Sequence, residues 1–161
     1  MFKKGLKIVL MLSVILAIAG CANKAEDNDS KEVNVAVNDI ADKIINEIDM
    51  GAMGTMQDEM AEASYPFDRS IVSEFVIYHA MMNVHSDEFA VFKVKDKNKI
   101  SEIESAIENR VEELNKIWET YLPDQHEKVK NYIVEKNGNY VMFAITSDQE
   151  KAKEIFNSYM K

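Results

Sequence analysis

The sequence of 161 residues contains a single cysteine, Cys21. No disulfide can form within the chain, so the fold has to rest on its own hydrophobic core. Glycine and proline are also scarce, with five and two residues. Hydrophobic residues make up 47% of the chain and charged residues 29%, which is typical of a folded domain rather than a disordered one. The length suits one domain with an appendage.

The short motifs of common enzymes are absent as well. The sequence has no His-Glu-x-x-His, Gly-x-Ser-x-Gly, glycine-rich phosphate loop or paired cysteines. The three histidines, His79, His85 and His126, are scattered, and no pattern brings a nucleophile, a base and an orienting group together. The sequence therefore predicts a protein that is not an enzyme.

The charge is strongly negative and unevenly distributed. Residues 1–20 contain three lysines and no acidic residue, so their removal takes the formal charge from −9 to −12. An acidic domain is repelled by phosphate backbones and by anionic lipid head groups. Nucleic acid is therefore excluded as a partner.

The first 21 residues form a processing signal. Lys3, Lys4 and Lys7 precede an apolar run at Ile8–Ile18, which is too short to span a bilayer but suits the hydrophobic part of a signal peptide. The run ends in Ile18-Ala19-Gly20-Cys21, which resembles the lipobox of bacterial lipoproteins, with isoleucine where leucine is commonest. The resemblance implies cleavage between Gly20 and Cys21 and a diacylglycerol on the sulfur of Cys21. The alternative is an uncleaved signal anchor with a buried structural cysteine.

This assignment predicts a signal peptide over residues 1–20, a lipidated tether over 21–34 and a single domain over 35–161. The predicted location is the outer face of the plasma membrane. No cofactor is predicted apart from the covalent lipid on Cys21. Ala22–Asn34 has almost nothing to bury, and thirteen residues of flexible chain span about 20 Å. The domain is then expected to stand clear of the lipid.

Hydrophobic periodicity predicts helices and strands throughout the domain. Asn137-Gly138 is a typical hairpin turn, Asn34 and Asp96 are expected to cap the helices that follow them, and Ser147-x-x-Glu150 is a capping box. The predicted helices are 35–49, 57–63, 97–122, with a further turn over 124–130, and 147–160; the predicted strands are 71–79, 88–95, 132–136 and 139–146.

These elements predict an α+β fold with an antiparallel four-stranded sheet packed against helices, in the order α-β-β-α-β-β-α. Alternate residues on both sides of the strands are apolar, so both sheet faces need a cover. Helices account for one face. The other requires the first helix and the methionine-rich segment after it, a second copy of the chain, or a partner protein.

Several short segments resemble a known family, the bacterial lipoproteins that carry domain of unknown function 4358. The segments are Glu88-Phe-Ala-Val-Phe-Lys-Val-Lys-Asp96, Arg110, Tyr121-Leu-Pro123, Gly138-Asn-Tyr-Val141 and Ser147-Asp148. The resemblance runs from about Val35 to the end of the chain. It implies a small lipoprotein of the kind found mostly in Gram-positive Clostridia, and it implies no activity. The use of 17 lysines against two arginines is typical of such an AT-rich source.

Methionine and histidine are the most distinctive candidate ligands. Thioether and imidazole groups suit Cu(I), so one interpretation is a site for this metal or for a small molecule. The other interpretation is that methionine fills irregular gaps in the core, since spacings of three and four also describe one buried helix face. The residues concerned are Met50, Met53, Met56, His79, Met81, Met82 and His85.

Arg110 is one of two arginines and lies among glutamates. It is either an anchor for an anion or a partner, or the partner of a neighbouring acid. Glu88, which opens a strand, is either paired or exposed. The sequence as a whole favours a non-enzymatic surface lipoprotein that binds an envelope protein or a ligand, followed by metal or small-molecule handling and then by an envelope enzyme.

Overall fold

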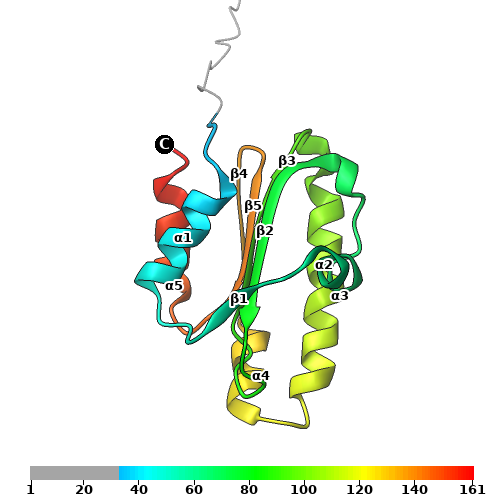
Figure 1. The fold of residues 1–161 in the computed structure, drawn as a ribbon, viewed down its shortest axis with the longest axis vertical. Coiled ribbons are helices and arrows are strands. Elements are labelled where there is room, and N and C mark those ends of the chain that lie inside the picture. The colour runs from blue at the N-terminus through cyan, green and yellow to red at the C-terminus, as the bar shows by residue number, and fades with distance from the viewer. Residues whose placement is uncertain (1–32) are drawn as a thin grey trace, which may run out of the picture. The chain divides into compact units, whose positions relative to one another are not determined.

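The computed structural model describes residues 33–161 (Figure 1). The predicted signal peptide, the cleavage point at Gly20 and Cys21, and most of the predicted tether lie outside these residues. No helix within residues 33–161 is long and apolar enough to cross a bilayer. In chain order the elements are α1 (Val37–Glu47), β1 (Met53–Thr55), α2 (Asp58–Ser64), β2 (Val72–Ala80), β3 (Glu88–Val94), α3 (Ile100–Trp118), α4 (Pro123–Lys130), β4 (Ile133–Asn137), β5 (Tyr140–Ile145) and α5 (Gln149–Ser158).

The strands form one antiparallel sheet in the order β1-β2-β3-β5-β4. The α+β class and the antiparallel sheet are confirmed, but the predicted number of four strands is wrong. The additional strand is β1, which places Gly54 opposite His79 on β2. Three residues with a central glycine are too few to show an alternating pattern, so the sequence did not indicate this strand.

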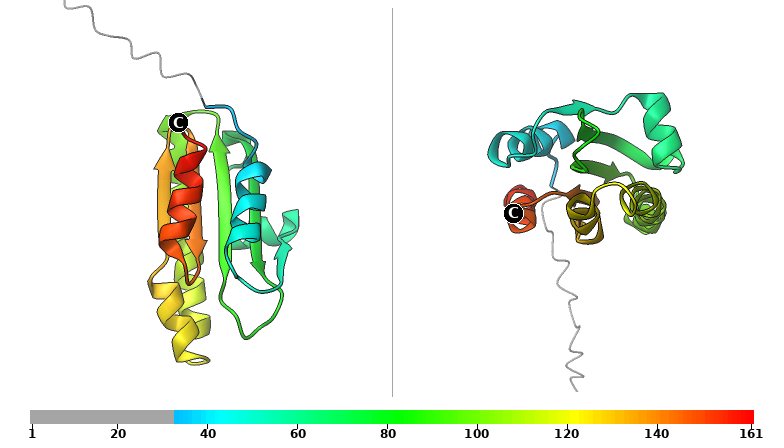
Figure 2. Two further views of the ribbon diagram at one scale, coloured as in Figure 1. Left: turned by 90° about the vertical axis from the view of Figure 1, so that its left-hand side faces the viewer. Right: turned by 90° about the horizontal axis from the view of Figure 1, so that it is seen from below.

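Helices cover both faces of the sheet. α1 and α5 lie on one face, and α2 and α3 lie on the other (Figure 2). The first helix and the methionine-rich segment were one of the three covers considered for the second face. The structure has α1 there together with α5, and Met50 lies in this core whereas Met56 lies in the opposite one. The result is a three-layer domain with two separate cores.

The two cores explain why the central strands are apolar throughout. In β5 every residue is buried. Val141 and Phe143 belong to the core under α2 and α3, whereas Met142 and Ala144 belong to the core under α1 and α5. Alternate side chains of a strand point to opposite faces, so a strand between two helical layers has to be apolar at each position. Burying a phenylalanine such as Phe143 stabilises the fold by about 1.5–3 kcal/mol.

Three local details differ from the sequence prediction. The hairpin closes at the pair Asn137 and Tyr140, so its two-residue loop begins at Gly138, whose φ of +60° suits glycine. Asn34 does not cap α1; Ala36 occupies that position, and Asn34 instead accepts a hydrogen bond from the Lys93 ammonium. The cap of α5 is Asp148 rather than Ser147.

The chain enters the domain at one end of the sheet, and the β2–β3 loop lies at the other (Figure 1). The Tyr140 hydroxyl accepts a hydrogen bond from the Val35 amide at 2.9 Å and donates one to the Val35 carbonyl at 2.7 Å. Tyr140 pairs with Lys93 near the end of β3, whereas Glu88 opens β3. Five residues of antiparallel strand span about 17 Å, which separates the entry point from the β2–β3 loop.

The edge strands of the sheet are β1 and β4. β1 has only three residues. On β4, Lys136 pairs with Glu104 of α3 at 2.6 Å, and Glu135 lies 3.9 Å from Lys153 of α5. Both faces of this edge therefore carry charge.

Candidate functional site

A cavity of about 170 Å³, which we call the end pocket, opens at the end of the sheet remote from Val33. It is bounded by the end of β2, the β2–β3 loop, the start of β3 and the second half of α3. Its lining includes His79, Met82, His85, Glu88, Arg110, Ile117 and Trp118.

A buried ion pair forms one wall of the end pocket. Arg110 donates to both carboxylate oxygens of Glu88, from Nε at 2.8 Å and from Nη2 at 2.7 Å. The Tyr65 hydroxyl donates to Glu88 Oε1 at 2.5 Å. The side chain of Glu88 is 4% exposed and that of Arg110 is 14% exposed. Both carboxylate oxygens of Glu88 are therefore engaged by buried or partly buried donors.

The local sequence explains how these groups meet. Glu88 lies on the same face of β3 as Ala90 and Phe92, which pack under α2 and α3. Arg110 follows Ile107 by three residues and precedes Leu114 by four, so it borders the buried stripe of α3. Of the two interpretations of Arg110, the structure shows the ion pair with an acid. The main partner is Glu88 on β3, and a helix neighbour is only a second contact. Glu113, the neighbour, is 3.4 Å from Nη1.

The network also shifts acid–base equilibria. Burial and the adjacent charge of Glu88 raise the pKa of the Tyr65 phenol well above its usual value. Burial alone would lower the pKa of Arg110, but the hydrogen bonds and charge of Glu88 outweigh it and raise that pKa. Sequence reasoning did not find Tyr65, because 23 residues separate it from Glu88 and no local pattern joins them.

We expect the Tyr65 phenol to make stability depend on alkaline pH. Its folded pKa is raised, so its stabilising contribution is complete below the unfolded pKa of about 10 and is lost as pH rises above it. The loss approaches 1.4 kcal/mol per pH unit from this group. Urea unfolding at pH 8, 10 and 11 should show a smaller decline for Tyr65→Phe than for the wild type. Tyr121→Phe, at an exposed position, is the matched control, and equal declines in wild type and Tyr65→Phe would contradict the prediction.

A second polar cluster ties the β2–β3 loop to α4. The Ser86 amide donates to the Gln125 side-chain oxygen at 2.9 Å, and Lys128 donates to Asp87 Oδ2 at 2.8 Å. All three of Ser86, Asp87 and Gln125 are buried. Asp87 is thus paired with a cation through Oδ2, but its buried Oδ1 has no hydrogen-bond partner within residues 33–161.

The structure divides the methionine and histidine candidates into two groups. Met50 lies in the core under α1 and α5, and Met56 lies in the core on the opposite side of the sheet. Met53, on β1, packs against the first of these cores. Met81, Met82, His79 and His85 instead lie on or beside the β2–β3 loop, and Met82 and both histidines line the end pocket. Within residues 33–161, no group of three His, Cys, Asp or Glu side chains is placed to hold a metal ion.

Exposed apolar side chains gather around the end pocket. Met81, Met82, Val84, Ile117 and Tyr121, which we call the end patch, range from 39% to 69% exposed. Met82 and Ile117 line the pocket itself, and Tyr121 packs on Trp118 with ring centroids 5.7 Å apart. Among residues 33–161, the remaining large and exposed apolar side chain is Met60 on α2. The predicted helix 97–122 included Tyr121, but α3 ends at Trp118, and Tyr121 lies beyond it and is exposed.

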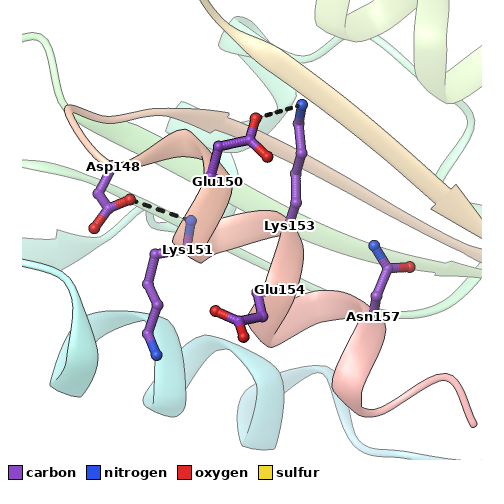
Figure 3. A pocket seen from close by; sticks show the side chains of 6 residues that line it. All are labelled: Asp148, Glu150, Lys151, Lys153, Glu154 and Asn157. Atoms are coloured by element: carbon purple, nitrogen blue, oxygen red, sulfur yellow. Dashed lines mark hydrogen bonds and ion pairs between the residues drawn. The ribbon is translucent and has the colours of Figure 1, made fainter.

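A wider depression of about 690 Å³ lies along α5 (Figure 3). Its six lining side chains are all polar or charged and all come from α5 and its cap. Asp148 and Glu150 are bonded within the same helix. One solvated helix surface offers no convergent groups, so the end pocket is the better candidate.

Residues 46–146 match a family described as Domain of unknown function (DUF4358). The chain belongs to this family. The matched segment of the DUF4358 domain extends from the end of α1 to the residue after β5, and it includes Tyr65, Glu88, Arg110 and the whole β2–β3 loop. Neither curated proteins nor solved structures gave a match to the chain.

Proposed function

We propose that this DUF4358 protein is a lipoprotein, anchored through Cys21 on the outer face of the plasma membrane, that binds an envelope protein through the end patch. The observation that carries the proposal is the concentration of exposed apolar side chains at one end of the domain. Soluble domains rarely expose contiguous apolar surface without a use for it. The lipobox-like segment Ile18-Ala19-Gly20-Cys21 supports the anchoring part.

The position of the end patch suits a tethered protein. Val33, where the described chain begins, lies beside Tyr140 at the opposite end of the sheet. A tether that leaves from Val33 therefore keeps the end patch on the side of the domain away from its attachment. A surface so placed is accessible to a partner that stands out from the membrane.

The chemistry of the end patch indicates the kind of partner. Two methionines and a loop valine form an adaptable apolar surface, and Tyr121 adds an aromatic side chain of the type that often dominates binding energy. Exposed carboxylates flank it on α3, including Glu113 and Glu119, and the domain as a whole is acidic. Charge complementarity favours a partner surface with an apolar centre and a basic rim.

A cross-linking experiment on intact cells tests the proposal. A photo-reactive phenylalanine analogue at Tyr121 is expected to capture one envelope protein, whereas the same analogue at Met60 is expected not to capture it. Against the purified partner, Ile117→Ser with Tyr121→Ser should weaken binding at least tenfold, which corresponds to about 1.4 kcal/mol. Met60→Ser is the matched control, since Met60 is also exposed but lies on α2. Equal binding by both variants, or capture of only small apolar molecules by the pocket, would contradict the proposal.

A further inference from the structure

The segment from His79 to His85 concentrates soft metal ligands at the end pocket. Its sequence, His-Ala-Met-Met-Asn-Val-His, has two imidazoles and two thioethers within seven residues. His79 is the penultimate residue of β2. His85 ends a turn in which its amide donates a hydrogen bond to the Met82 carbonyl at 3.1 Å. Three of the four side chains, those of His79, Met82 and His85, line the same cavity of about 170 Å³.

The fourth side chain is placed by a glycine on the neighbouring strand. Gly54 lies opposite His79, so a Cβ atom at Gly54 would point to the same face of the sheet as that of His79. Such a Cβ would lie 3.2 Å from Met81 Cγ and 3.5 Å from Met81 Sδ. Opposite Cβ atoms in an antiparallel pair are about 5 Å apart. The Met81 sulfur is therefore on the face that carries His79, and the absence of a side chain at Gly54 makes room for it.

Most of the charged groups nearby are already paired. Glu88 is held by Arg110 and Tyr65, and Asp87 Oδ2 is held by Lys128, whereas Asp87 Oδ1 has no hydrogen-bond partner within residues 33–161. Met81 and Met82 are 69% and 53% exposed, so their side chains are able to turn toward a common point. No third His, Cys, Asp or Glu completes a site for a harder metal within residues 33–161. Two imidazoles and two thioethers select a soft monovalent ion over Zn²⁺, Mg²⁺ or Ca²⁺.

We propose that His79, Met81, Met82 and His85 bind Cu(I). The site differs from the wider methionine and histidine set seen in the sequence, because Met50 and Met56 lie in separate cores. It shares Met81 and Met82 with the end patch, but it goes beyond the proposed function and does not rest on it, because the histidines are not part of the end patch and Ile117 and Tyr121 are not ligands.

Anaerobic titration of the purified full chain in detergent, with Cu(I) in competition with a coloured Cu(I) chelator, tests this site. We expect one Cu(I) per chain. Met81→Leu with Met82→Leu preserves apolar volume and should weaken Cu(I) binding at least tenfold. His79→Asn with His85→Asn should do the same, and X-ray absorption of the wild-type complex should show both sulfur and nitrogen bound to copper.

Three further variants isolate the cause of any change. Met60→Leu should leave the affinity unchanged, because Met60 lies on α2. Gly54→Ala removes no ligand and requires only a small shift of the exposed Met81 side chain, so it should weaken binding less than the double methionine variant. Ile117→Ser with Tyr121→Ser, which tests the proposed function, should leave Cu(I) affinity intact. Circular dichroism confirms that each variant is folded. Less than one-tenth of an equivalent bound, affinity unchanged by the histidine or methionine variants, or tighter binding of Zn²⁺ than of Cu(I) would overturn the proposal.

Discussion

Replacing Arg110 with methionine should lower the free energy of unfolding by about 3–5 kcal/mol at neutral pH. The substitution keeps most of the aliphatic volume of the side chain but leaves the buried Glu88 carboxylate without its cation. Tyr65 alone then remains to donate to that carboxylate. Chemical denaturation of the folded domain measures the change directly. A loss of this size is a large part of the 5–15 kcal/mol that typically stabilises a domain.

Two comparisons separate the buried ion pair from surface charge. Glu113→Gln removes a carboxylate that also contacts Arg110, but this carboxylate is about half exposed, so we expect a change of 1 kcal/mol or less. Glu88→Gln combined with Arg110→Met removes both charges and should be less destabilising than the sum of the two single changes, because no lone charge stays buried. A cost below about 1 kcal/mol for Arg110→Met would show that water reaches Glu88 and that the pair is not effectively buried.

Replacing Cys21 with serine should abolish acylation of the protein completely. Serine has no thiol for the diacylglycerol, and Cys21 is the only cysteine in the chain, so no other thiol accepts the label. Labelling cells with a clickable palmitate analogue should mark the wild type and give no signal for Cys21→Ser. Intact mass of the wild type should correspond to a chain that begins at Cys21 and carries lipid. Two acyl chains, at about 0.8 kcal/mol per buried methylene, hold such a protein firmly in a membrane.

The alternative of an uncleaved signal anchor makes the opposite prediction. In that case the wild type would retain residues 1–20, carry no palmitate label and behave identically after Cys21→Ser. Ile18→Leu is the matched control, because it restores the commonest residue of the lipobox and should leave labelling and processing unchanged.

The elements with long, regular patterns were predicted well from the sequence. The stripe of Ile103, Ile107 and Leu114 located α3, and Asn137-Gly138 located the β4–β5 hairpin to within one residue. The apolar face of α3 could be recognised in the sequence because a 19-residue helix repeats its pattern several times. β1 offered no such repetition, and its three residues fall between the predicted helices 35–49 and 57–63, where no element was predicted.

The methionines show why spacing alone misleads. Met50, Met53 and Met56 are three residues apart, which is also the spacing of one helix face. The chain there forms an extended segment that runs along the sheet edge, so Met50 and Met56 enter different cores. His79, Met82 and His85 line one pocket because they are close in sequence and the β2–β3 hairpin keeps them close in space. The pairing of Glu88 with Arg110 and Tyr65 depends on three elements that only the tertiary fold brings together.

The charged edge at β4 has a consequence for copies that share a membrane. Lipid anchoring would confine molecules to two dimensions, where neighbours collide often and an open strand edge is a template for polymerisation between sheets. A second strand laid along β4 would have to displace or bury Glu135 and Lys136, which are tied to α5 and α3 on the two faces. Together with the brevity of β1, this arrangement disfavours polymerisation through the edges of the sheet.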